Sequence, residues 1–126
     1  MTRYLISFDA TAMDHIPEED FPAVGQAAHA VVQEAIDAGV WVFGAGLEGV
    51  RSTVVATDGL VTDGPYPESK EIIGGFSIVD VASLEDAQAW AAKIAVGCRC
   101  AQSVWQLQDD PEQDEMLRRA AQSRSA

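Results

Sequence analysis

Two side chains near the start of the chain have the chemistry to move a proton near neutral pH, His29 and Asp9. His29 lies at the edge of the apolar stripe of a predicted helix, next to Val32 and Ile36 on the helical wheel. An imidazole titrates near neutral pH and acts as a general acid or base when a partner orients it. Asp9 directly follows the first predicted strand. Each residue also has a structural interpretation: a half-exposed histidine bound to water or a carbonyl, and an aspartate that caps the turn over residues 10 to 14.

The segment VTDGPYPESKEIIGGF contains a second group of candidate residues. Asp63 can accept backbone N–H groups from Tyr66 or its neighbours in an Asx turn, with the following Gly-Pro pair setting the corner. Lys70 leaves this segment, and Arg51 begins the preceding hairpin strand. If both project at the same end of the sheet, they form a cationic spot for the carboxylate or phenolate of a small ligand. In the alternative, Lys70 pairs with a neighbouring glutamate or with an acid of a second subunit.

The two cysteines, Cys98 and Cys100, are separated only by Arg99. Neighbours at this spacing form strained disulfides at best, and such a pair has half the ligands that a structural zinc needs. We therefore expect two reduced thiols and no metal site, with a redox role favoured by Arg99 as the alternative. The glycine-rich stretches GAGLEG and IIGGF open no helix, so no nucleotide loop and no cofactor are expected.

The spacing of apolar residues predicts strands at RYLISFD, VWVF, GFSIVDV and QSVWQLQ. VWVF is continuously apolar, which is typical of a strand buried on both faces. Helices are predicted from Pro22 to Ala38 and over SLEDAQAWAAKI, where Ser83 is the N-cap. Asp58-Gly59 predicts a hairpin. This order indicates an α+β fold: the ferredoxin-like split β-α-β with an inserted hairpin, an antiparallel sheet and both helices on one face.

The predicted strands carry large apolar side chains on both faces, although the helices cover only one. Two sheets packed face to face would cover the other, so the sequence predicts a homodimer, a dimeric α/β barrel. We expect residues 1–108 to form this domain. Residues 109–126 form an acidic C-terminal tail with a short helix or a frayed end.

The chain is strongly acidic, with a net charge of −12 from 20 acidic and 8 basic residues. Such a chain repels nucleic-acid backbones and anionic membranes, so neither is expected as a partner. No run approaches the roughly 20 apolar residues of a membrane span, and the first residues show no signal-peptide cleavage motif. We therefore expect a cytoplasmic protein.

Four motifs occur in order along the second half of the chain. They are DGPY at 63–66, ESKE at 68–71, GGF at 74–76 and WAAK at 90–93. From about Tyr4 to Leu107 the chain resembles the DGPF-domain branch of the YCII-related proteins. The resemblance implies a ferredoxin-like dimeric α/β barrel, and it matches His29 and Asp9 to the histidine and aspartate of a catalytic pair in the wider family. The last strand, VWQLQDD, departs from the E-V-R-P-like ending of that family.

Two functions are compatible with these residues. The first is a cofactor-independent lyase or isomerase acting on a small aromatic or carbonyl compound. His29 would move the proton, Asp9 would orient His29, and Lys70 or Arg51 would hold an anionic group. The second is a non-catalytic homodimer that binds a small molecule or a protein partner, with a regulatory role, because DGPF domains are known alongside extracytoplasmic-type sigma factors. The sequence favours neither over the other.

Overall fold

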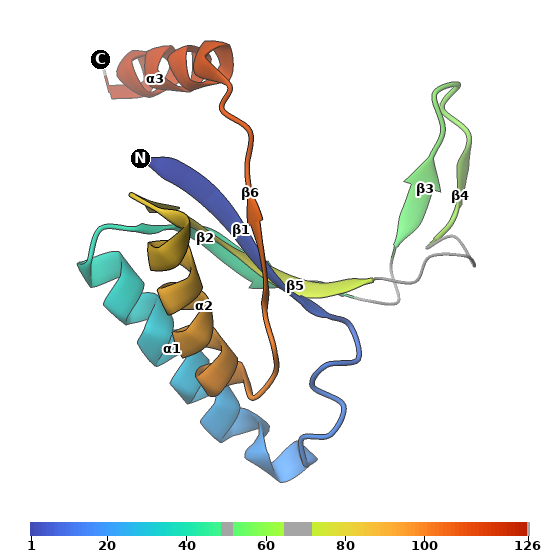
Figure 1. The fold of residues 1–126 in the computed structure, drawn as a ribbon. Coiled ribbons are helices and arrows are strands. Elements are labelled where there is room, and N and C mark those ends of the chain that lie inside the picture. The colour runs from blue at the N-terminus through green and yellow to red at the C-terminus, as the bar shows by residue number, and fades with distance from the viewer. Residues whose placement is uncertain (49–51, 65–71, 126) are drawn as a thin grey trace.

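The computed structural model describes residues 1–48, 52–64 and 72–125, and its centre is a four-stranded antiparallel sheet (Figure 1). The strand order is β2-β5-β1-β6. The strands are β1 (Thr2–Asp9), β2 (Trp41–Gly46), β5 (Ile73–Val81) and β6 (Ser103–Gln106). This is the strand order of the split β-α-β arrangement, so the predicted ferredoxin-like α+β fold is confirmed.

Two long helices cover one face of the sheet (Figure 1). They are α1 (Phe21–Asp37), preceded by the short 3₁₀ helix η1 (Glu18–Asp20), and α2 (Leu84–Cys98). α2 starts where predicted, because the Ser83 hydroxyl oxygen accepts the Asp86 N–H at 3.2 Å. α1 ends before Gly39, whose φ of 75° is the left-handed conformation that glycine adopts readily.

The core lies between the sheet and α2. It consists of strand side chains packed against small and apolar residues of the helix: Tyr4, Ile6, Val79, Val81, Ala87, Ala91 and Ile94. The two helices approach closely at Gly97, where an added Cβ would lie 3.3 Å from the Ala27 carbonyl oxygen. The small residues of α2 therefore let it pack closely against both the sheet and the neighbouring helix α1.

The opposite side of the sheet, called here the uncovered face, has no described element packed on it. Side chains alternate along a strand, and residues paired across strands share a face. Because Tyr4 and Ile6 point into the core, Leu5 and its register partners Ile78 and Trp105 lie on the uncovered face. By the same register, this face is mostly apolar and includes Arg3, Leu5, Ser7, Phe43, Ala45, Phe76, Ile78, Asp80, Ser103 and Trp105.

β2 differs from its predicted environment. Its VWVF sequence is typical of a strand buried on both faces, yet Val42 is 47% and Phe43 58% exposed. The reason is its position: β2 is an edge strand, and one of its two faces belongs to the uncovered face. The Phe43 ring contacts Phe76, with 6.3 Å between ring centroids.

The inserted hairpin consists of β3 (Thr53–Val55) and β4 (Val61–Asp63) and stands apart from the sheet and helices (Figure 1). Its turn forms where the Asp-Gly pair predicts it: the Leu60 N–H donates to Asp58 Oδ1 at 2.9 Å, and Gly59 has a φ of 88°. Neither strand contacts another described element. Val55 and Val61 therefore stay exposed.

The C-terminal tail forms α3 (Pro111–Ser125), which is longer than the short helix predicted. Asp110 accepts the Gln113 N–H at 3.0 Å at its start, and Arg119 pairs with Glu115 at 3.0 Å within it. An ion pair between Arg3 and Asp114 links α3 to β1. None of the helices in the described ranges combines the length and apolarity that a membrane span requires.

Candidate functional site

The uncovered face contains a cleft of about 370 Å³ at the end of the sheet where β1 finishes. Its walls are mostly apolar, with two hydroxyls and one carboxylate among them. The lining residues are Leu5, Ser7, Phe8, Asp9, Ile72, Ile73, Ser103 and Trp105. The cleft therefore combines apolar surface with a few polar groups, as small-molecule sites commonly do.

The strand register brings these residues together from three strands. Ser7 of β1 pairs with Ser103 of β6, and Leu5 pairs with Trp105, so both hydroxyls and the indole share one face. On the other side, β1 shifts register between Phe8 and Asp9, which places Asp9 opposite Ile73 of β5. The Ala10 N–H then donates to the Ile72 carbonyl at 2.7 Å and joins the two strand ends.

The Gly74-Gly75 pair makes this close approach sterically feasible. A Cβ on Gly74 would lie 2.8 Å from the Cα of Ala10 and 3.0 Å from the Asp9 carbonyl oxygen. A Cβ on Gly75 would lie 2.6 Å from the tip of the Phe8 ring. The two glycines therefore serve strand geometry beside the cleft, within one chain.

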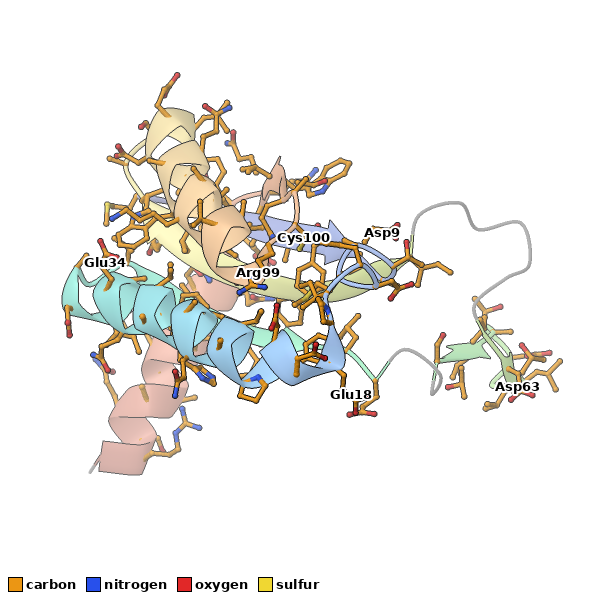
Figure 2. All side chains as sticks on the ribbon, turned by 90° about the horizontal axis from the view of Figure 1, so that it is seen from below. Asp9, Glu18, Glu34, Asp63, Arg99 and Cys100 are labelled. Atoms are coloured by element: carbon orange, nitrogen blue, oxygen red, sulfur yellow. The ribbon has the colours of Figure 1, made fainter. Side chains whose placement is uncertain are left out.

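Asp9 lies at the end of β1 (Figure 2), and Thr11 fixes its carboxylate. The Thr11 N–H donates to Asp9 Oδ1 at 2.9 Å and the Thr11 hydroxyl donates to the same oxygen at 2.7 Å. These two hydrogen bonds, the backbone bond first, hold the pKa of the Asp9 carboxyl below its ordinary value. Asp9 thus caps the turn after β1, as one interpretation of the sequence predicts. It also places an ionised group at the cleft.

His29 lies elsewhere on the molecule. It is an exposed residue of α1, which packs against α2 and β2 on the helix-bearing face. His29 is absent from the cleft lining, and no hydrogen bond in the described part of the chain joins it to Asp9, whose bonds go to Thr11. The structure of the single chain therefore does not bring the two residues together. A catalytic role for them stays a prediction.

The candidate ligand-binding residues of the sequence analysis are not gathered at the cleft either. Asp63 is exposed on β4 of the hairpin, well apart from Asp9 (Figure 2). Arg51, Tyr66 and Lys70 lie outside the described residues, so their proposed roles stay predictions.

The cysteines are free thiols at the end of α2. Arg99 between them ends the helix in the left-handed conformation, at φ 58°, and its guanidinium donates to Asp20 Oδ2 at 2.8 Å. Burial raises the pKa of the Cys98 thiol and also that of Cys100. Both thiols therefore stay protonated near neutral pH, and the redox alternative gains no support. In the ranges that the structure describes, no three His, Cys, Asp or Glu side chains gather as metal ligands would.

Several cleft residues were not identified from the sequence: Leu5, Ser7, Ile72, Ile73 and Ser103. The signal for Leu5 and Ser7 was present, because they alternate with Tyr4 and Ile6. Trp105 belongs to the predicted strand QSVWQLQ. The structure places it in the cleft.

Taken together, the strand order, the two helices on one face and the cleft on the other define an α+β protein of ferredoxin-like architecture with an open sheet. Comparison with protein families agrees with this class, since the model of the YCII-related domain matches residues 13–100. The chain belongs to the YCII-related family. A search of curated proteins found no match.

Proposed function

We propose that this chain, a member of the DGPF-domain branch of its family, is a homodimeric protein that binds a small molecule in the cleft of the uncovered face. The observation that carries the proposal is the cleft itself, with Leu5, Ile73 and Trp105 as apolar walls and Ser7 and Ser103 as hydroxyl groups. Its volume of about 370 Å³ falls in the usual range for small-molecule sites, roughly 300–1,000 Å³.

The apolar walls supply the driving force for binding. Removing apolar surface from water contributes about 25 cal/mol per Å². The hydroxyls of Ser7 and Ser103 lie side by side on paired strands, so they suit a single polar group of the ligand. Ser7 is only 4% exposed, so its hydroxyl has little access to water. A ligand that covers this hydroxyl without hydrogen-bonding to it would leave a buried polar group unpaired, so the site favours ligands that make the bond.

The homodimer supports this function by covering the face that carries the cleft. Phe43 and Trp105 are 58% and 57% exposed in the single chain, although both are large and apolar. A second copy packed sheet to sheet would remove them from water and enclose the cleft between the two sheets.

The lyase or isomerase alternative would use the same cleft, with Asp9 as the group nearest a bound substrate. It also needs a proton carrier there. His29 is on the helix-bearing face of its own chain, so the geometry favours binding over proton transfer by this pair.

A cleft-filling variant tests the proposal. We expect Ser103→Trp to weaken binding of the neutral fluorescent probe N-phenyl-1-naphthylamine by tenfold or more, which corresponds to about 1.4 kcal/mol. Ser123→Trp is the matched control, because Ser123 is exposed on α3 and does not line the cleft. Equal probe binding by the two variants, with both folded by circular dichroism, would contradict the proposal.

A second variant separates the two functions. His29→Ala should leave probe affinity within twofold of the parent, because His29 does not line the cleft. If His29→Ala abolished binding or ligand-dependent turnover while the fold was kept, the catalytic alternative would replace the binding function.

A further inference from the structure

The cleft has a single charged lining residue within the described ranges, and that charge is negative. Asp9 is the only acid among the lining residues, and no arginine or lysine is among them. Most basic side chains of the described ranges are paired with acids elsewhere. The pairs are Arg3 with Asp114, Lys93 with Glu34, Arg99 with Asp20, and Arg118 and Arg119 with Glu115.

The Asp9 carboxylate is held ready for a ligand. Thr11 donates twice to Oδ1, which fixes the orientation of the group and leaves Oδ2 without a hydrogen bond from the described residues. The same two bonds keep the pKa of Asp9 low, so the carboxylate is ionised at neutral pH. A carboxylate accepts hydrogen bonds and donates none, and a charged donor binds it more strongly than a neutral one.

Apolar residues line the cleft beside this carboxylate, which is itself exposed at the cleft's edge. Ile73 is the register partner of Asp9, with Ile72 next to it, and Trp105 supplies an aromatic wall farther along β1, opposite Leu5. These walls can remove the apolar body of a ligand from water, while the exposed carboxylate at the edge stays open to a charged group.

We infer that the ligand is an organic ammonium compound, with its ammonium group at Asp9 Oδ2 and an aromatic or branched apolar body against Trp105, Ile72 and Ile73. The inference rests on the proposed function and adds the chemical class of the ligand. The charge of the whole chain acts in the same direction, because a net charge of −12 raises the local concentration of cations.

Three ligands of nearly equal size test the inference: 2-phenylethylamine, 2-phenylethanol and phenylacetate. They carry a positive, a neutral and a negative group on the same aromatic body. We expect the amine to bind about tenfold more tightly than the alcohol in isothermal titration calorimetry, and the carboxylate to bind most weakly. Amide chemical shifts of Ser7, Asp9 and Ser103 should respond to the amine.

Asp9→Asn should lower the affinity for the amine to that of the alcohol and leave the alcohol unchanged. Asp37→Asn is the matched control, because it removes the same charge from the end of α1 on the helix-bearing face, and an amide oxygen still accepts from Gln33. If both variants weakened amine binding equally, net charge would be responsible and the site at Asp9 would be refuted.

The remaining outcomes separate this inference from the proposed function. If the three ligands bound with equal affinity, and Ser103→Trp weakened the binding of each, the ammonium preference would be overturned. The cleft would still be a binding site. Tightest binding of phenylacetate would also overturn it, in favour of the cationic spot predicted around Lys70 and Arg51. Binding of none of the three, together with no binding of the neutral probe, would overturn both.

Discussion

Gly74 is a residue at which a single methyl group should disturb both the fold and the cleft. A Cβ there meets backbone atoms, the Ala10 Cα at 2.8 Å and the Asp9 carbonyl oxygen at 3.0 Å, so no side-chain rotation relieves the clash. We expect Gly74→Ala to lower the free energy of unfolding by about 1–3 kcal/mol, measured by urea denaturation.

Gly25 is the matched control for this change. It lies inside α1, and an added Cβ would have nothing within 4 Å. Because alanine is the better helix former, Gly25→Ala should raise the free energy of unfolding by about 0.5–1 kcal/mol. A Gly74→Ala variant as stable as Gly25→Ala would show that β1 and β5 do not approach as closely as described.

Thr11 controls the titration of Asp9. Since the folded-state pKa of Asp9 is lowered, its contribution to stability is present above the ordinary aspartate pKa, about 3.9, and is lost as pH falls through the lower folded-state value. Thr11→Val removes the hydroxyl bond and keeps the N–H bond, so the Asp9 pKa should rise partway toward its ordinary value.

The measurement is a carboxyl ¹³C NMR titration of Asp9 in both proteins. Thr57→Val is the control, because Thr57 is an exposed residue of the hairpin turn and makes no bond to Asp9. An unchanged Asp9 midpoint in Thr11→Val would contradict the role of the hydroxyl.

At this scale the sequence predicted some roles well and others poorly. The turn-capping role of Asp9 follows from local sequence, because its partner Thr11 is two residues away. The separation of His29 from Asp9 does not follow from local sequence. Helical periodicity predicts which face of its helix a residue occupies, but not how far that residue lies from the end of a strand. Ser103 and Ile72 could be found only from strand pairing between distant segments.

The N-cap of α2 is the clearest prediction at the scale of secondary-structure elements. The Ser83 hydroxyl satisfies the Asp86 N–H, which would otherwise have no partner in the first turn. Ser83→Ala should cost about 0.5–2 kcal/mol in the free energy of unfolding, measured by urea denaturation. Ser83→Asp, which keeps an acceptor oxygen, should restore most of this stability. Equal losses in both variants would assign the effect to something other than the cap.

Elements with strong local signals were predicted closely. Apolar and polar residues alternate along β1, a serine N-cap marks the start of α2, and an Asp-Gly pair marks the hairpin turn. Each of these elements forms where expected. The length of α3 was underestimated because few apolar residues anchor it, whereas its ion pairs and its cap at Asp110 support 15 residues. The exposure of β2 was missed because a continuous apolar run predicts burial of a strand. It does not show whether the same chain or a second copy covers that strand.

For the whole molecule, the uncovered face is where two forces oppose each other. Its apolar side chains favour association with a second sheet, while the net charge of −12 on each copy opposes association. Repulsion between like charges is screened by salt over a Debye length of about 10 Å at 0.1 M, whereas the apolar contribution is not weakened by salt. A homodimer formed through this face should therefore become tighter as ionic strength rises.

Phe43 is the residue with which to test this homodimer, because it lies on the uncovered face outside the cleft lining and is 58% exposed. Phe43→Glu should place a charge within the contact and raise the dimer dissociation constant by tenfold or more, measured by sedimentation equilibrium. Phe21→Glu is the control, since Phe21 is 45% exposed at the start of α1 on the helix-bearing side. Equal effects of the two substitutions, or a parent protein that stays monomeric at high salt, would mean that a second copy does not cover this face.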